Sequence, residues 1–436
     1  MDIVALWAER QPDRPAIVDD ERTVTWRDYH ERRNRLADAL GALGLAGGEH
    51  VVLYAHNSFE YLLAGAASRA LGVVPVPMNH HLTYEEALYI LDDADAAAVF
   101  VGDEYLATAE RLRGAAPGVR AWIALGRLRR AGFLHVDDLL ASGRSVTPPT
   151  PEGQGLGGSM IYTAGTTGKP KGARRAATNP AALVERLAVF GLTEPGHVHL
   201  VAGPLYHAAP GGFAGYSQLF GATLVVMPRF DPEAALGLIA RHRCTSTFMA
   251  PTLLGRIVDL PAAVRARYDT SSMRSIVVAG APCPMRVKEA VMAQFGPVLY
   301  EFYGSSELGV NTVLRPEDVL AKPGSCGRAA PGVELAVLDD RGAPVPAGTP
   351  GELHVRRGAG VFDEYWKKPE ATRETARGDW LSVGDVAWID ADGFVYICDR
   401  KRDVIISGGV NIYPAEIEDA LHRHPGVLDV AVFGVP

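Results

Sequence analysis

The stretch 160-MIYTAGTTGKPKGARR-175 decides the fold, and it raises the question of what its central loop binds. Apolar and aromatic residues run directly into a segment of glycine, threonine, lysine and proline. Gly165, Gly168 and Gly172 allow backbone N–H groups to approach an anion closely, and the threonine hydroxyls and lysines add donors and positive charge. The composition favours a phosphate-binding loop, and the alternative that stays open is a solvated surface turn.

Two common nucleotide-binding loops do not fit this segment. A Walker-type loop needs a glycine, four residues and then Gly-Lys-Ser/Thr. Here Thr163 stands in place of the first glycine, and Pro170 follows Lys169 where Ser or Thr is required. A GxGxxG pattern at 153–158 lies in a Pro/Thr/Gly-rich stretch rather than between a strand and a helix. Because proline disfavours a helix here, we expect a flap rather than a helix N-terminus.

Length, charge and cysteine usage limit the class of protein. A chain of 436 residues is too long for one compact core, so at least two domains or subdomains are expected. The net charge of −8 argues against a nucleic-acid partner. Four widely spaced cysteines without a CxxC pair indicate a reduced, cytoplasmic protein without structural zinc. No signal peptide is predicted, because the N-terminus has no basic region followed by an apolar run. No membrane span is predicted, because the least polar stretch, 199–228, is broken by prolines and glycines.

Strand and helix signals alternate along the first half of the chain. Residues 23–45 predict a short strand and then an amphipathic helix with Leu36, Leu40 and Leu43 on one face. The order strand, helix, strand repeats over 50–79 and again over 84–101. Such alternation is typical of parallel sheets covered by helices.

The pattern of secondary-structure signals changes towards the end of the chain. From Gly324 onward short strands alternate with turn signals, which predicts a β-rich subdomain. Residues 404–436 restart a strand–loop–helix–strand unit whose last strand ends at the terminus. We therefore predict an α/β fold. It has a large N-terminal domain of two helix-covered β-sheets plus a β-rich subdomain, and then the start of a small α+β C-terminal domain.

A resemblance to a known family emerges at the opening loop. YTAGTTGKPKGA resembles the phosphate loop of the adenylate-forming superfamily: acyl-CoA synthetases, peptide-synthetase adenylation domains and beetle luciferases. PLYHAAP (204–210) resembles that family's acyl-pocket segment, VAGAP (278–282) its adenine-contact turn and FYGSSELG (302–309) its aromatic-Gly-x-Thr-Glu signature. Residues 351–418 are similar to the region that runs into its hinge. The motifs occur in the family's order over essentially the whole chain, closest to acyl-CoA ligases.

The resemblance implies a two-step reaction. A carboxylate attacks the α-phosphorus of ATP to give an acyl-adenylate and pyrophosphate, and the acyl group then forms a thioester with CoA. Both reactants of the first step are anionic, so charge neutralisation and positioning should dominate catalysis. We therefore expect Mg²⁺, lysines and backbone donors rather than a nucleophilic side chain. No Gly-x-Ser-x-Gly elbow occurs at Ser217, Ser306 or Ser325.

The resemblance also assigns roles to individual residues. Glu307 is the expected Mg²⁺ ligand and the Thr163 hydroxyl a second candidate, since Mg²⁺ takes one or two protein oxygens plus phosphates. Taken alone, a glutamate after GSS is more often a helix-start carboxylate. Ser306 keeps the hydroxyl where the family usually has threonine. The expected catalytic residues are Thr163, Lys169, His207 and Glu307.

The nucleotide site is expected around Tyr303, which should stack on adenine. Asp385 should accept the ribose hydroxyls and Arg400 should reach the ribose or phosphates. Without the motif, the tyrosine would be assigned to the core and the two charged residues to surface ion pairs. The expected nucleotide-binding set is Thr163, Ala164, Gly165, Thr166, Thr167, Gly168, Lys169, Lys171, Gly280, Ala281, Pro282, Glu301, Phe302, Tyr303, Gly304, Ser305, Ser306, Asp385 and Arg400.

The acid is expected to bind beside His207, a residue that Tyr206 could orient. Small residues follow this histidine, and no aspartate lies between Gly203 and Phe230. An α-amino acid does not fit this pocket, because its ammonium group would be buried without a partner. A fatty or aryl carboxylic acid fits better. The expected pocket residues are Tyr206, His207, Ala208, Ala209, Phe248 and Gly304.

The last part of the chain should serve the second half-reaction. Ser407, Gly408 and Gly409 resemble the turn beside the pantetheine tunnel for CoA, with a plain hairpin turn as the alternative. The expected boundaries are 1–399 for the AMP-binding domain, 400–403 for a hinge that contains Arg402, and 404–436 for the start of a cap domain. The family's C-terminal lysine, which bridges the carboxylate and α-phosphate, would lie beyond Pro436. We therefore expect the sequence to be a fragment, the alternative being natural truncation.

Three functions remain open at this point. The first is a CoA ligase, and the second loads the same acyl-adenylate onto a carrier protein's phosphopantetheine or onto an amine. The third is an idle nucleotide- or acyl-AMP-binding protein, which truncation and the unusual Ala164 would favour. Ala164 removes at most one hydrogen bond to phosphate, worth ~1.5–3 kcal/mol, so it should slow adenylation without abolishing it. The identity of the acid is left open.

Overall fold

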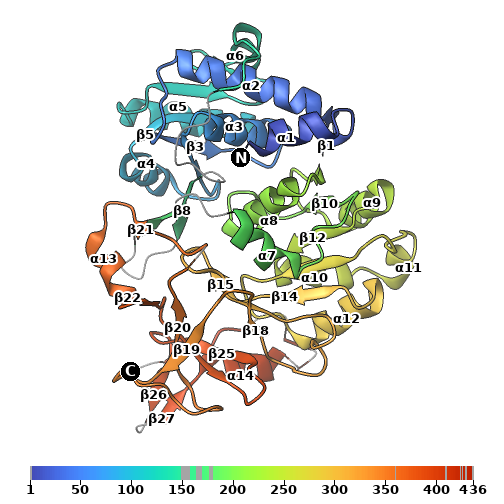
Figure 1. Cartoon of the computed structure of the whole chain (residues 1–436), viewed down its shortest axis with the longest axis vertical. Coiled ribbons are helices and arrows are strands. Elements are labelled where there is room, and N and C mark those ends of the chain that lie inside the picture. The colour runs from blue at the N-terminus through green and yellow to red at the C-terminus, as the bar shows by residue number, and fades with distance from the viewer. Residues whose placement is uncertain are drawn as a thin grey trace. The chain divides into compact units, whose positions relative to one another are not determined.

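The computed structural model of the chain (Figure 1) divides into two compact units, which are described separately here. Unit 1 comprises Met1–Met249, Leu260–Ser275 and Phe362–Pro369, and unit 2 comprises Ala250–Asp259, Ile276–Val361 and Glu370–Pro436. The structure describes residues 2–148, 158–163, 169–175, 180–358, 360–407, 410–422, 424, 426–427 and 430–434.

The first sheet of unit 1 is parallel and covered by helices on both faces, as the alternating pattern predicts. Its strand order is β4-β3-β5-β6-β7. Val51 and Leu53 of β3 pack with α2 (Trp26–Ala42), α3 and α6, whereas Val52 and Tyr54 pack with α4 and α5. The elements are β3 (His50–Tyr54), α3 (Phe59–Ala70), β4 (Val74–Pro77), α4 (Tyr84–Asp93), β5 (Ala96–Val101), η1 (Asp103–Tyr105), α5 (Leu106–Ala115), β6 (Ala121–Ala124), β7 (Leu134–His135) and α6 (Val136–Ser142).

A second sheet of unit 1 places β12, β10, β11 and β1 side by side in parallel, with β2 antiparallel at the β1 edge. Leu36 and Leu40 of α2 are fully buried, but Leu43 is 36% exposed. The prediction that Leu43 belongs to the apolar face of this helix is wrong, because α2 ends at Ala42. The elements are α1 (Ile3–Arg10), β1 (Pro15–Val18), β2 (Thr23–Thr25), α2 (Trp26–Ala42), α7 (Pro180–Ala188), β10 (Val198–Val201), α8 (Ala208–Leu219), β11 (Thr223–Val226), α9 (Pro232–His242), β12 (Ser246–Met249) and α11 (Ala262–Arg265).

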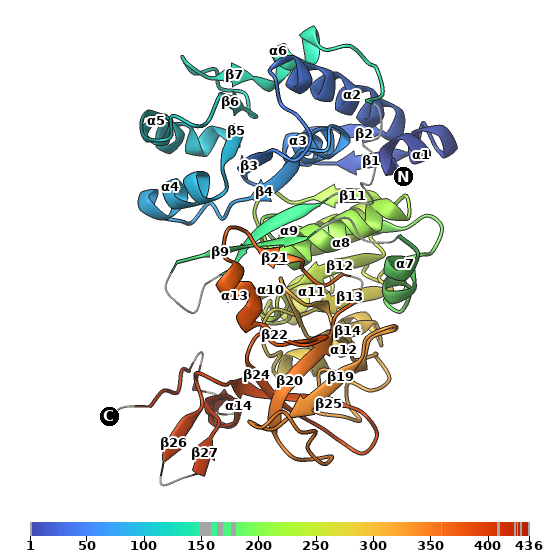
Figure 2. The same ribbon diagram turned by 60° about the vertical axis from the view of Figure 1, so that its left-hand side comes forward.

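The opening stretch forms an antiparallel hairpin of β8 (Ser159–Thr163) and β9 (Lys171–Arg175), in which Thr163 pairs with Lys171. No helix begins at Pro170, as its sequence position predicts. The third strand of this small sheet, β21 (Glu364–Tyr365), comes from far along the chain and pairs with β9 (Figure 2).

Unit 2 contains the parallel pair β13–β14 and the β-rich part that the sequence predicts after Gly324. Its largest sheet has the order β22-β23-β20-β24-β25, with β19 also paired to β20. The elements are α10 (Pro251–Val258), β13 (Ser275–Val278), α12 (Met285–Phe295), β14 (Leu299–Glu301), β15 (Gly304–Ser305), β16 (Gly309–Val310), β17 (Thr312–Val313), β18 (Arg328–Ala329), β19 (Leu335–Leu338), β20 (Gly351–Arg356), α13 (Pro369–Glu374), β22 (Ala376–Arg377), β23 (Trp380–Leu381), β24 (Asp385–Ile389) and β25 (Val395–Arg400).

The last part of unit 2 departs from the predicted strand–loop–helix–strand unit. Here β26 (Ile405–Ser407) and β27 (Val410–Ile412) form a hairpin, followed by α14 (Pro414–His422). The described residues 430–434 contain no strand, because their backbone forms no ladder with any described strand. Among the described helices, none combines the length and apolar character that a membrane span requires.

Candidate active site

The predicted site residues fall into two groups, one in each unit. Ala164, Gly165, Thr166, Thr167, Gly168, Gly408 and Gly409 lie outside the described residues. Unit 1 holds Thr163, Lys169, Lys171, Tyr206, His207, Ala208, Ala209 and Phe248. Unit 2 holds Gly280, Ala281, Pro282, Glu301, Phe302, Tyr303, Gly304, Ser305, Ser306, Glu307, Asp385, Arg400, Arg402 and Ser407.

The hairpin β24–β25 brings Asp385 and Arg400 together as direct cross-strand partners. The Arg400 Nε lies 3.2 Å from the Asp385 Oδ1. The carboxylate is buried, with 8% of its side chain exposed, whereas the arginine side chain is 45% exposed. The two residues that the sequence assigns to the ribose and phosphates are therefore one ion pair, with its charged arginine facing solvent.

Tyr303 joins this ion pair from the segment after β14. Its hydroxyl donates to the Asp385 Oδ2 at 2.5 Å. Burial, and then the neighbouring Asp385 carboxylate, raise the pKa of the Tyr303 phenol well above its ordinary value. The phenol is thus a neutral hydrogen-bond donor at pH 7, and Tyr303, Asp385 and Arg400 form one connected group.

The predicted adenine turn lies at the carboxyl end of β13. This strand is parallel to β14, and the Phe302 N–H donates to the Val278 carbonyl at 3.1 Å. Gly280 follows with φ +94°, a conformation that favours glycine, and it is exposed together with Ala281 and Pro282. Ligands of α/β sheets bind beyond the carboxyl ends of parallel strands, so this edge is suited to a planar base.

Glu307 lies in the turn between β15 and β16 rather than at the start of a helix, so the helix-start alternative is wrong. The N–H groups of Glu307 and Leu308 donate to the Ser305 Oγ, which fixes the turn. A Cβ at Gly304 would stand 2.0 Å from the Gly309 carbonyl oxygen, so the hairpin requires glycine there. The glutamate is buried, with 7% of the residue exposed.

The environment of Glu307 fits a magnesium ion of the kind the sequence predicts. The described residues contain no group of three or more His, Cys, Asp or Glu side chains that could hold a metal alone. Mg²⁺ does not need such a group, because it uses one or two carboxylates and completes its shell with phosphate oxygens and water. A buried carboxylate in a fixed turn therefore suits Mg²⁺ that arrives with a nucleotide.

A buried ion pair under the β13–β14 edge escapes sequence-based prediction. Lys288 of α12 pairs with Glu301 of β14, and their side chains are 3% and 9% exposed. Burial raises the pKa of the Glu301 carboxyl, and Lys288 acts in the opposite direction. The Glu301 carboxylate, expected at the nucleotide, thus has an internal partner, and no local signal links the two residues.

In unit 1 the predicted acid-binding segment is held by Asn57, a residue that the sequence does not single out. The Asn57 side-chain amide donates to the carbonyls of Gly203 and Met227 at 2.9 and 3.1 Å. Its oxygen accepts from the Leu205 N–H at 2.8 Å. Asn57 is buried, so this residue fixes the chain just before His207.

His207 itself is exposed at the N-cap of α8, and its ring lies 4.3 Å from the Tyr206 ring, centroid to centroid. Although the residue as a whole is exposed, partial desolvation of the imidazole ring, and then the nearby His81, lower the pKa of His207. Phe248 is deeply buried, where its ring stacks on that of Phe213 at 5.4 Å.

Tyr206 also belongs to a cluster of aromatic and imidazole rings whose other members are not among the predicted pocket residues. The His80 ring lies 4.9 Å from Tyr206 and 4.3 Å from His56, and the Tyr105 hydroxyl lies 2.9 Å from the His56 Nε2. Burial lowers the pKa of His80 to about 4, so this imidazole is neutral at pH 7. The sequence signal for this cluster is the unusual pair His80-His81 shortly after β4.

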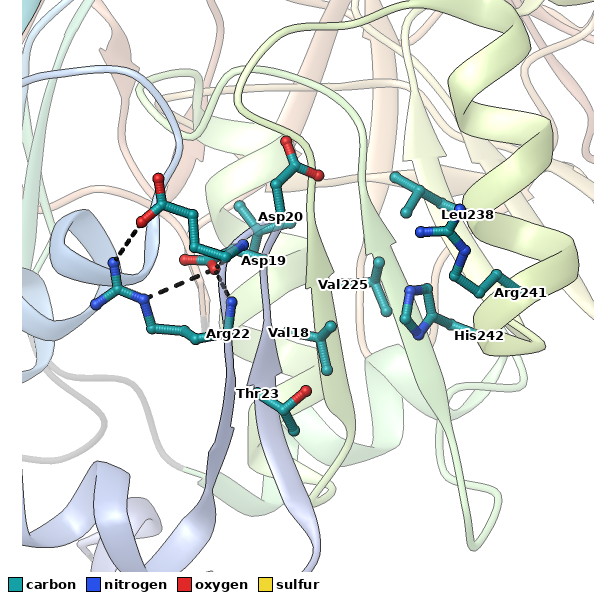
Figure 3. A pocket seen from close by; sticks show the side chains of 11 residues that line it. Val18, Asp19, Asp20, Arg22, Thr23, Val225, Leu238, Arg241 and His242 are labelled. Atoms are coloured by element: carbon teal, nitrogen blue, oxygen red, sulfur yellow. Dashed lines mark hydrogen bonds and ion pairs between the residues drawn. The ribbon is translucent and has the colours of Figure 1, made fainter.

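One polar pocket of about 380 Å³ lies elsewhere in unit 1, between the β1–β2 hairpin, β11 and α9 (Figure 3). Arg22 lies on the hairpin side, where its Nε faces Asp19, and its guanidinium also pairs with Glu60 at 2.7 Å. Arg241 and His242 line the opposite side. None of the sequence-predicted site residues lines this pocket, so it is separate from the candidate site.

Comparison with known proteins gives a consistent result over most of the chain. A family model described as AMP-binding enzyme matches residues 4–366. The chain is 34% identical over 441 residues to a fatty acid–acyl-carrier-protein ligase of Streptomyces coeruleorubidus, covering 98% of this chain and 82% of that protein. It is 34% identical over 433 residues to a feruloyl-CoA synthase of Amycolatopsis sp, covering 98% of this chain and 84% of the relative.

A solved structure agrees with the fold. The crystal structure of the anthranilate CoA ligase AuaEII in complex with anthranoyl-AMP matches with a TM-score of 0.90 and 29% sequence identity. The match covers 100% of this chain and 85% of that one.

Proposed function

Because the chain belongs to the AMP-binding enzyme family, we propose that it activates a carboxylic acid with ATP and passes the acyl group to a thiol. In the first step a carboxylate oxygen bonds to the α-phosphorus, and the bond from that phosphorus to pyrophosphate breaks. In the second step the thiol sulfur bonds to the acyl carbon, its proton is lost, and AMP leaves with the carboxylate oxygen.

The observation that carries this proposal is the connected group Tyr303–Asp385–Arg400 beside the carboxyl ends of β13 and β14. A neutral aromatic ring suits a stacked adenine, and a carboxylate suits the paired hydroxyls of a ribose. The arginine, exposed at the edge of the group, suits the phosphate side of the same nucleotide. Tyr303, Asp385 and Arg400 thus suit, in that order, the adenine, the ribose and the phosphate of AMP.

The remaining residues divide the catalytic work in the proposal. Lys169 neutralises phosphate charge, and His207 lines the approach of the acid. Glu307, with Thr163 as a second candidate, would hold magnesium, which would supply charge neutralisation at the phosphates. No side chain is required to form a covalent intermediate.

The thiol in the leading proposal is that of CoA, and the acid is fatty or aryl. One relative is named for a fatty acid and a carrier protein, and another for ferulate and CoA, so both acid classes and both thiol classes occur among related chains. A carrier-protein phosphopantetheine or an amine is therefore the second candidate acceptor. The proposal places the enzyme in the cytoplasm, which the cysteine pattern favours.

The test is product analysis with a panel of fatty and aryl acids, ATP and Mg²⁺, with and without CoA. The proposal predicts AMP, pyrophosphate and an acyl-CoA that all depend on the acid. An acyl-adenylate that accumulates despite CoA would move the acceptor to a carrier protein or amine. ATP binding without acid-dependent pyrophosphate release would instead support the idle nucleotide-binding alternative.

A further inference from the structure

Both described lysines of the opening stretch lie over tyrosine rings. The Lys169 Nζ is 5.2 Å from the centre of the Tyr89 ring, and the Lys171 Nζ is 5.2 Å from that of Tyr365. An ammonium over an aromatic face is attracted by the electron-rich ring. Tyr365 belongs to β21 and is part of the same small sheet, whereas Tyr89 belongs to α4, outside it. Tyr89 is therefore an external support for Lys169.

The hydroxyl of Tyr89 makes a second contact, with the residue that follows Lys169. Its oxygen lies 3.2 Å from the Pro170 carbonyl oxygen and 3.2 Å from the Asp93 Oδ1, and it donates to one of them at a time. Proline has no N–H and a fixed φ, so holding its carbonyl orients the peptide group that precedes β9. Ring and hydroxyl together hold two successive residues, Lys169 and Pro170.

Asp93 explains why Tyr89 can serve as a fixed support. It is the last residue of α4, where the helix dipole disfavours a carboxylate, so helix stability does not account for its place. Its side chain is 9% exposed and accepts from the Tyr162 hydroxyl of β8 at 2.8 Å. The Lys368 Nζ lies 3.0 Å from its Oδ1. Asp93 thus ties α4 to both β8 and the segment after β21.

A neighbouring ion pair strengthens the same connection. The Lys367 Nζ lies 2.7 Å from the Asp95 Oδ1. Both residues adopt positive φ, +55° for Lys367 and +49° for Asp95. This conformation is unfavourable for most residues other than glycine, asparagine and aspartate. This exposed ion pair gives the end of α4 a second, weaker contact with the segment after β21.

We propose that Tyr89 is a positioning residue that sets the place of Lys169 before MgATP binds. The inference rests on the proposed function, in which Lys169 meets the phosphates of ATP. A lysine held in place loses less freedom when the nucleotide arrives, and the saving appears as tighter MgATP binding. The acid does not contact Lys169 in this proposal, so its binding is independent of Tyr89.

The experiment compares three variants of the full chain. Tyr89→Leu removes ring and hydroxyl, Tyr89→Phe keeps the ring, and Tyr84→Leu is a matched control, since Tyr84 lies on the same helix with its ring against Arg111. We expect Tyr89→Leu to weaken MgATP binding about fivefold and to raise KM for MgATP by the same factor. Tyr89→Phe should change both quantities about twofold. kcat and KM for the acid should change by less than about twofold, and Tyr84→Leu should match the wild type.

The pathway through Lys169 is tested by adding Tyr89→Leu to a Lys169→Met chain, where it should have no further effect on KM for MgATP. A full additional effect would overturn the proposal, as would equal rises in KM for acid and MgATP, which indicate a general structural loss. Direct MgATP binding without acid separates the two claims. A wild type that binds MgATP but turns over no acid would refute the proposed function, while unchanged binding by Tyr89→Leu would refute the role of Tyr89.

Discussion

Tyr303, Asp385 and Arg400 illustrate how burial decides which contact matters most. The phenol and the guanidinium both contact the buried Asp385 carboxylate, but the Tyr303 residue is less exposed to water than the half-exposed Arg400 side chain. A hydrogen bond to a buried charge contributes about 1.5–3 kcal/mol, whereas an ion pair with a half-exposed arginine contributes about 0–1 kcal/mol. The neutral partner should therefore contribute more to stability than the charged one.

The first prediction follows from this ranking. Tyr303→Phe should lower the free energy of unfolding by about 1.5–3 kcal/mol, and Arg400→Met by less than about 1 kcal/mol. Urea unfolding of both variants measures the difference. The ranking would be wrong if Arg400→Met were the more destabilising change.

At the scale of elements, the contact between α12 and β14 depends on the Lys288–Glu301 pair. Lys288→Met leaves a buried carboxylate without its partner, so it should cost about 3–5 kcal/mol of unfolding free energy. Replacing both members, as Lys288→Met with Glu301→Leu, should recover most of that loss because no buried charge remains. Denaturant titration of the single and double variants tests this, and a double variant no more stable than the single one would contradict it.

The contact between β10 and β12 makes stability depend on pH. The Ser246 hydroxyl lies 2.8 Å from the His197 Nε2 and 2.7 Å from the His199 Nδ1. Burial lowers the pKa of His197 to about 4 and that of His199 to about 3, from 6.5 in the unfolded chain. Above pH 6.5 neither state is protonated, so the pair has no effect on stability there.

Below pH 6.5 the unfolded chain binds protons that the folded chain does not, so stability falls as the pH falls towards 4. Each histidine contributes at most about 1.4 kcal/mol per pH unit in this window. His199→Gln removes one titrating group, so its unfolding free energy should fall less steeply between pH 6 and 4 than that of the wild type. Identical slopes would show that His199 is protonated in the folded protein.

The sequence predicts some elements better than others for a physical reason. The unit from β3 to β4 is local: an apolar run, the Ser58 cap of α3 and the turn after it are contiguous in the chain. The β9–β21 pairing is not local, since Arg174 contacts Glu364, 190 residues away. Asn57, Lys288 and Asp93 were missed for the same reason, because their partners are distant and their own neighbours look ordinary.

At the scale of the whole molecule, motif order predicted the chemistry more fully than the arrangement of domains. Family membership and the α/β class are confirmed. The structure joins Tyr303, Asp385 and Arg400 in one group, whereas their roles towards a nucleotide stay predictions. The boundary after residue 399 and the hinge at Arg402 stay predictions. A motif fixes which residues meet a ligand, whereas domain boundaries depend on contacts spread over many side chains that no single motif encodes.

The most direct test of the proposed reaction is exchange of labelled pyrophosphate into ATP, which reports reversible acyl-adenylate formation without any acceptor. We expect exchange that requires Mg²⁺ and that a fatty or aryl acid, but not an α-amino acid, stimulates. Exchange with no acid in the panel, by a chain that binds MgATP, would contradict acid activation as the function of this protein.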